Sequence, residues 1–201
     1  MALNRKIAYI DLGTGEVRIE TIPAEWREKF LGGRGLDAYL LYTHAPEGCD
    51  PLGPDNVALI SAGLLVGTLA SASARTHIMA KSPLTNLLGS ANMGGFFGPE
   101  MRWAGFDHLV IRGRAEHPVY LYIQNGEIEI RHAGYLWGAG VYDTQTLVRR
   151  ELGDDEAQVL CIGPAGENLV RFATVMTGRK NAAGRTGMGA VLGSKNLKAV
   201  V

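Results

Sequence analysis

The chain has 201 residues, a length sufficient for one domain with a substantial hydrophobic core. Its 20 basic and 20 acidic side chains cancel, so the charge balance argues against a nucleic-acid partner. The composition, 46% hydrophobic and 20% charged, is typical of a globular protein, and no apolar run reaches the roughly 18 residues of a membrane-spanning helix. The first residues lack the apolar segment of a secretory signal, so we expect a cytoplasmic protein without a membrane partner.

The first half of the chain predicts a hairpin, helices and buried strands in succession. Residues 6–12 and 16–22 are short β-type runs around a Gly-Thr-Gly turn, and Pro23 favours the start of a helix. The remaining predicted elements are a second helical stretch at 36–42, strands at 57–62 and 75–81, and a helix through 100–104.

The second half is richer in strands. Residues 108–130 predict three strands, with a hairpin turn at Asn125-Gly126, and residues 144–152 predict an amphipathic helix closed by Gly153. Two further strands are predicted at 159–163 and 170–176. Because strands do not alternate regularly with long helical crossovers, the order favours an α+β fold over a doubly wound sheet.

A glycine-rich motif occurs twice, at residues 92–98 (NMGGFFG) and 187–193 (GMGAVLG), with Arg75 and Arg185 upstream of the two copies. Glycine lets backbone N–H groups approach a ligand closely, and guanidinium groups match phosphate oxygens. The repeat predicts an internally duplicated chain, with halves of roughly 95 residues, that holds a ligand with two anionic ends. The alternative is that these glycines only form tight turns that pack helices on a sheet. Neither copy is a dinucleotide-binding or P-loop fingerprint.

No catalytic constellation accompanies the glycine motifs. The five histidines are scattered and lack metal-binding spacing, so each is expected to be structural, on the surface or half-buried. The acidic run at 154–156 follows Gly153 in a turn, and no nucleophile motif is present. Cys49 and Cys161 lack C-x-x-C spacing, which argues against a zinc or iron–sulfur site within the chain. We therefore expect no catalytic residue in this segment.

Five segments form long, uncommon motifs in a fixed order: residues 32–36 (GGRGL), Arg75 with 80–85 (AKSPLT), 91–98 (ANMGGFFG), 162–170 (IGPAGENLV) and 182–200 (AAGRTGMGAVLGSKNLKAV). These motifs resemble the tungsten-dependent aldehyde ferredoxin oxidoreductase family. The resemblance runs nearly the whole length of the chain and covers only the family's N-terminal domain. It implies an α+β, internally duplicated two-sheet domain spanning residues 1–201, with the cluster-binding and substrate domains absent.

The resemblance also implies a cofactor and its ligands. The cofactor is a tungsten or molybdenum bis-pterin whose phosphates are joined through magnesium, with a [4Fe–4S] cluster held by residues outside this chain. Asn92 and the backbone carbonyl of Ala182 are expected to bind the magnesium. One departure stands out, because many relatives carry arginine where this chain has Asn181; the neighbouring basic residues Arg179 and Lys180 are the candidates to replace that charge. The full set of expected cofactor-binding residues is Arg75, Asn92, Gly94, Asn181, Ala182, Gly184 and Arg185.

For the complete protein, the resemblance implies oxidation of aldehydes to carboxylates with electron transfer through the cluster to ferredoxin. The segment alone is expected to lack turnover, to work with later domains of the same protein and to belong to a homo-oligomer. Two alternatives stay open: a paralogous reductase subunit with a non-aldehyde substrate, and a free-standing pterin-binding or assembly module without turnover. The downstream sequence would separate the module from the enzyme.

Overall fold

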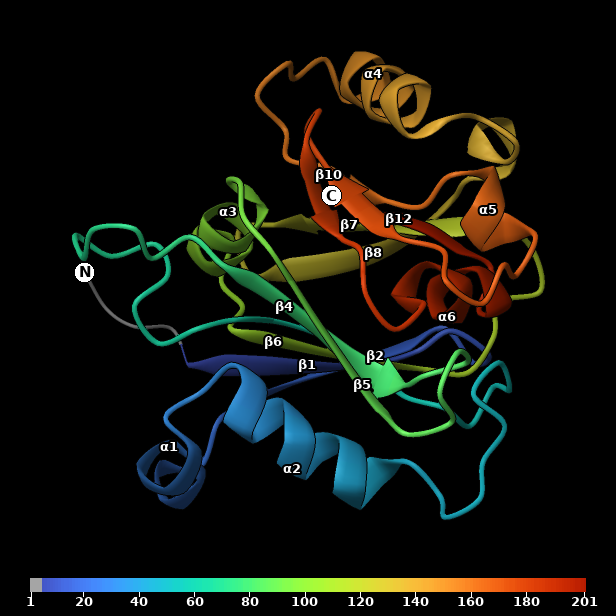
Figure 1. Cartoon of the computed structure of the whole chain (residues 1–201). Coiled ribbons are helices and arrows are strands. Elements are labelled where there is room, and N and C mark those ends of the chain that lie inside the picture. Colours follow the sequence, from blue (N-terminus) through green and yellow to red (C-terminus); the bar gives the residue numbers. More distant parts are fainter. Residues whose placement is uncertain (1–4) are drawn as a thin grey trace.

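Two six-stranded mixed sheets dominate the computed structural model, which describes residues 5–201 (Figure 1). The first sheet has the order β2-β1-β6-β3-β4-β5 and consists of β1 (Lys6–Asp11), β2 (Glu16–Thr21), β3 (Ala58–Ala62), β4 (Thr76–Lys81), β5 (Leu88–Met93) and β6 (His108–Arg112). The second has the order β11-β10-β9-β12-β7-β8 and consists of β7 (Val119–Gln124), β8 (Glu127–His132), β9 (Leu160–Cys161), β10 (Val175–Thr177), β11 (Asn181–Ala183) and β12 (Leu197–Val200).

The two sheets repeat one topology. Read from β8, the second sheet runs β8-β7-β12-β9-β10-β11, which matches the first sheet strand for strand. Each sheet has a single parallel pair at the corresponding place, β1 with β6 and β7 with β12, and its other pairs are antiparallel. The predicted α+β class and the internal duplication are confirmed.

Helices occupy corresponding places in the two halves. A pair of helical segments follows the first hairpin of each half, and a short helix lies between the last two strands. The helices are α1 (Ala24–Phe30), α2 (Arg34–His44), α3 (Phe97–Trp103), the 3-10 segment η1 (Gly134–Leu136), α4 (Val141–Leu152), α5 (Pro164–Glu167) and α6 (Met188–Ser194). In the described part of the chain, none of them is long and apolar enough to cross a bilayer.

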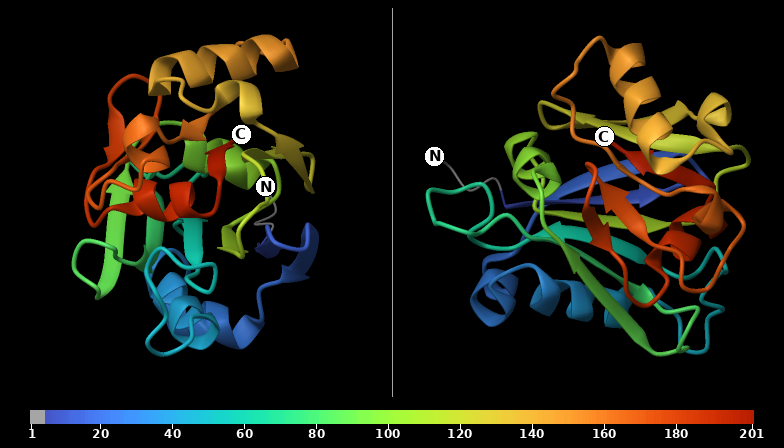
Figure 2. Two further views of the ribbon diagram at one scale, coloured as in Figure 1. Left: turned by 90° about the vertical axis from the view of Figure 1, so that its right-hand side faces the viewer. Right: turned by 45° about the horizontal axis from the view of Figure 1, so that its top comes forward.

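The layers follow from strands whose residues alternate between two buried faces. The main core lies between the sheets and takes Ile60 and Ile78 from the first, Leu160 and Leu197 from the second, with α3 and α6 contributing further apolar side chains. Helix α2 covers the outer face of the first sheet and α4 covers that of the second, as Figure 2 shows at the lower and upper ends of the molecule.

Most predicted elements are present with small shifts of their ends, and the exceptions lie in the second half and at the sheet edges. Residues 170–176 are not one strand, because Leu169 has φ +57°, the Ala173 N–H bonds to the Val170 carbonyl, and β10 begins only at Val175. Strands β5 and β11 were not expected as strands. Their glycine, serine, asparagine and alanine residues have low strand propensity, and pairing with β4 and β10 sets their conformation.

Candidate functional site

The two sheets meet at their edges, where β5 and β11 contact each other. An edge strand leaves half of its backbone N–H and C=O groups outside the ladder, available to a ligand. An open depression of about 460 Å³ lies at this junction, lined by Ser90, Ala91, Asn92, Ala182, Gly184 and Arg185. Equivalent strands of the duplicated halves thus supply its two sides.

Four of the seven residues expected to bind a cofactor line this depression: Asn92 from β5, Ala182 from β11, and Gly184 and Arg185 from the segment that follows. All four are exposed to solvent. A Cβ at Gly184 would have no neighbour closer than 3.8 Å, so the glycine leaves open space beside the backbone. The structure brings these residues together although about 90 positions separate them in the sequence.

The other three expected residues lie next to this group. Gly94 follows β5, and an ideal Cβ on it would lie 3.4 Å from Asn181 Oδ1. The Asn181 amide also covers Gly95, whose φ is +97°, so Asn181 packs against the turn of the opposite half. Arg75 is exposed and directly precedes β4, whose first residue pairs with Met93 next to Gly94.

The second glycine motif does not face the depression. All seven residues of α6 are buried, and Gly187 before it is buried as well. A Cβ on Gly187 would lie 2.0 Å from the Arg171 carbonyl oxygen, and one on Gly193 would lie 2.0 Å from the Gly166 carbonyl oxygen. The interpretation of residues 187–193 as a ligand loop is wrong. Their glycines permit close backbone packing, and it is Ala182, Gly184 and Arg185 just before them that reach the surface.

The donor set of the depression fits a ligand that combines phosphates with a hard cation. The Asn92 side chain and the backbone carbonyl of the exposed residue Ala182 are neutral oxygen donors, the ligand type that magnesium prefers. Arg185 supplies a charge that matches phosphate oxygens. Within residues 5–201 no group of three or more His, Cys, Asp or Glu side chains is placed to hold a metal ion. A magnesium ion here would therefore be bound by these protein oxygens together with oxygens of the phosphate-bearing ligand.

A polar network missed in the sequence lies beneath the depression. The fully buried Asp37 of α2 accepts hydrogen bonds from Ser61 Oγ at 2.5 Å, His77 Nδ1 at 2.5 Å and His108 Nδ1 at 2.8 Å. The other ring nitrogen of His77, Nε2, lies 2.9 Å from Ser90 Oγ. Burial alone would raise the pKa of Asp37, but the charges and hydrogen bonds of His108 and His77 outweigh it and lower that pKa. His77 and His108 are thus buried members of a network, contrary to the surface or half-buried role expected for each histidine.

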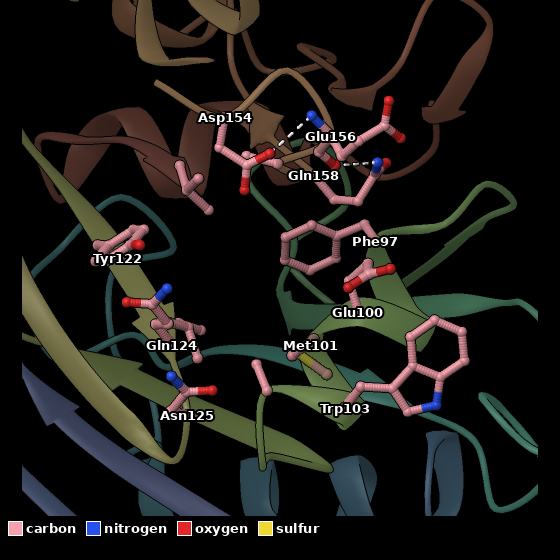
Figure 3. A pocket seen from close by; sticks show the side chains of 14 residues that line it. Phe97, Glu100, Met101, Trp103, Tyr122, Gln124, Asn125, Asp154, Glu156 and Gln158 are labelled. Carbon is pink, nitrogen blue, oxygen red and sulfur yellow. Dashed lines mark hydrogen bonds between the residues drawn. The ribbon is translucent and has the colours of Figure 1, made fainter. Parts of the chain in front are cut away.

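A second hollow, of about 320 Å³, lies between α3, the β7–β8 hairpin and the loop after α4 (Figure 3). Phe97, Met101 and Tyr122 form apolar walls, and three carboxylates also line the hollow, Glu100 on α3 and Asp154 and Glu156 on the loop after α4. Burial, with the nearby charges of Asp154 and Glu156, raises the pKa of Glu100. Among residues 5–201 no basic side chain lines this hollow, so it does not suit a phosphate-bearing ligand. The depression between β5 and β11 is the better candidate.

Comparison with known proteins places the chain in a family. Residues 7–201 match the model described as the N-terminal domain of aldehyde ferredoxin oxidoreductase. A tungsten-containing aldehyde ferredoxin oxidoreductase from Pyrococcus furiosus is 47% identical over 191 residues, covering 95% of this chain and 32% of that protein. The WOR-like subunit of an aliphatic sulfonate oxidoreductase from the same organism is 38% identical over 215 residues, covering 100% of this chain and 34% of that subunit.

A solved structure shares the fold closely. It is described as the active site complex BamBC of benzoyl coenzyme A reductase in complex with 1,5-dienoyl-CoA. The TM-score is 0.95 at 40% sequence identity, and the match covers 98% of this chain and 30% of that one. The chain spans about a third of the length of the curated relatives that it matches. It belongs to the aldehyde ferredoxin oxidoreductase family, a family of tungsten oxidoreductases, and forms its N-terminal domain.

Proposed function

We propose that the depression between β5 and β11 holds the phosphate and magnesium end of a tungsten bis-pterin cofactor, and that the complete protein is an aldehyde-oxidising oxidoreductase. The observation that carries this proposal is the convergence of Asn92 with Ala182 and Arg185 at the junction of two duplicated halves. A ligand with two related pterins fits a platform with two related edges.

Each residue has a role in this proposal. The Asn92 side-chain oxygen and the Ala182 carbonyl bind magnesium, and Arg185 neutralises phosphate charge. Gly94 and Gly184 let the cofactor approach the backbone, and Asn181 joins the two edges. Arg75 lies where it could contact both a pterin and a neighbouring cluster. The bound cofactor would supply the oxygen-transfer and redox chemistry, so no catalytic side chain is required from this domain.

The partners of the complete protein are part of the proposal. Later domains of the same protein cover the depression, and residues outside this chain hold a [4Fe–4S] cluster. Electrons then pass to ferredoxin, the acceptor in the names of the aldehyde-oxidising relatives. We propose a homo-oligomeric enzyme in the cytoplasm.

A second candidate is a reductase subunit that acts on a coenzyme A thioester. It is favoured by the TM-score of 0.95 and 98% coverage against the benzoyl coenzyme A reductase complex. The same depression would serve both reactions, because in this proposal its residues bind the cofactor and not the substrate. The substrate pocket outside this chain decides between them.

The test is an assay of the complete protein, purified without oxygen. Aldehyde-dependent reduction of a viologen dye would support the proposed activity, and turnover of an aromatic thioester without aldehyde oxidation would support the second candidate. An Arg185→Gln variant should lose bound pterin, whereas Arg150→Gln, on the exposed side of α4, should retain it. Equal pterin content in the two variants would contradict the role of Arg185. A folded protein without pterin and without turnover would support an assembly module.

A further inference from the structure

A hydrogen bond between His77 and the partly buried Ser90 connects the buried network of Asp37, His77, His108 and Ser61 to the depression. Ser61 pairs with His77 on one side and with His108 on the other, so three adjacent strands bring these side chains to one face. Helix α2 places Asp37 above them. A buried carboxylate is costly unless hydrogen bonds replace its water, and three donors replace it here.

The network fixes the orientation of Ser90. An ionised Asp37 only accepts hydrogen bonds, so both imidazoles place a hydrogen on Nδ1. The Nε2 of His77 is therefore left for Ser90 Oγ, 2.9 Å away. This contact takes up one of the bonding positions of the hydroxyl group and holds its χ1 angle. The remaining positions of the oxygen are free for a ligand.

Ser90 lies where a ligand would use it. It is two residues from Asn92 in β5, and residues at this spacing point to the same side of a strand. Both line the depression, and Ser90 is only partly buried, unlike the network behind it.

Apolar contacts also hold helix α2 on the first sheet. Helix α2 already packs on the first sheet through Leu36 and Leu40, which contact a cluster that includes Leu59 and Met79. Replacing buried ionic groups by apolar ones is often neutral or stabilising in proteins. The network runs from α2 to the rim of the depression, and its effect on the orientation of the Ser90 hydroxyl group explains it better than a role in stability.

We infer that Ser90 is a binding residue for the magnesium-bearing phosphate end of the cofactor, and that Asp37 and His77 are the residues that position its hydroxyl group. The inference rests on the proposed function and adds three residues to the site. The hydroxyl oxygen serves as a further hard oxygen beside Asn92, suited to the cation or to the water and phosphate groups around it.

The two histidines supply a matched pair of variants. An asparagine amide nitrogen can replace imidazole Nδ1 as the donor to Asp37, but it has no counterpart of Nε2. His77→Asn therefore removes the contact with Ser90, and His108→Asn perturbs the same carboxylate without touching Ser90. Ser90→Ala removes the hydroxyl group, and Ser90→Thr keeps it.

The experiment measures magnesium, tungsten and pterin per polypeptide in the complete protein before and after incubation with EDTA. We expect magnesium to leave Ser90→Ala and His77→Asn roughly tenfold faster than wild type, with Ser90→Thr and His108→Asn close to wild type. Thermal midpoints of the two histidine variants should be similar, which separates positioning from a loss of fold.

Three outcomes would overturn the inference. Wild-type release of magnesium from Ser90→Ala shows that the hydroxyl group is not used. Equal acceleration in His77→Asn and His108→Asn shows that the network acts through stability alone. If the wild-type protein contains tungsten and pterin, either of these results leaves the proposed function standing. A wild-type protein without pterin overturns both the inference and the proposed function.

Discussion

Gly193→Ala tests whether the second glycine motif serves packing. The new Cβ would lie 2.0 Å from the Gly166 carbonyl oxygen and 2.6 Å from the Gly166 carbonyl carbon, so α5 and α6 must separate by at least about 1 Å. Overpacking of a core costs about 1–3 kcal/mol, and here the obstacle is backbone, which cannot rotate away. We expect a loss of about 3 kcal/mol, or about 6–12 °C in the thermal midpoint of a chain of this size.

Gly184→Ala is the matched control. Its Cβ would meet only Thr174 Cγ2 at 3.8 Å, and its backbone is not in the left-handed region. We expect stability within about 1 kcal/mol of wild type. Equilibrium urea unfolding of the 201-residue chain, followed by tryptophan fluorescence, measures both variants. Equal midpoints for Gly193→Ala and wild type would refute the packing role of the motif.

Three further predictions concern buried titratable groups. Alkylation of the native chain should modify Cys49 and spare Cys161, because burial raises the pKa of the Cys161 thiol to about 12; peptide mass spectrometry showing equal labelling would contradict this. Burial also lowers the pKa of Lys195 to about 8 from 10.5, so between these values the unfolded chain binds more protons and the free energy of unfolding should rise with pH. Urea titrations across this range test that rise, which Lys195→Met should remove. Lys198→Met should cost about 3–5 kcal/mol because it leaves the carboxylate of Glu167 buried without its cation, and adding Glu167→Gln should recover part of the loss. Strict additivity in this double-mutant cycle would count against a coupled pair.

Sequence patterns predicted the elements whose conformation depends on residues close together in the chain. The Asn125-Gly126 turn is an example, because both residues have positive φ, as a tight hairpin between β7 and β8 requires. The buried runs of β3 and β6 were equally clear from their apolar side chains. The repeat of two halves was visible because equivalent strands carry similar residues.

Long-range contacts could not be predicted in this way. Asp37 meets His77 and His108 across 40 and 71 positions, and no spacing rule links a helix carboxylate to histidines on distant strands. For the site, the residues alone indicated glycines and arginines suited to phosphate. The assignment of Asn92 and Ala182 came from the family resemblance. Ser90 carried no signal, since a serine in a short polar strand is unremarkable until its neighbours are known.

The central claim is that the edges of the duplicated sheets hold one bis-pterin metal cofactor. Elemental analysis together with pterin quantification of the anaerobically purified complete protein tests it most directly, with an Asn92→Leu variant beside wild type. We predict tungsten or molybdenum, pterin and magnesium in constant proportion in wild type, and loss of magnesium with most of the pterin in the variant. A wild-type protein that is folded but free of pterin, or a variant with undiminished magnesium, would contradict the account.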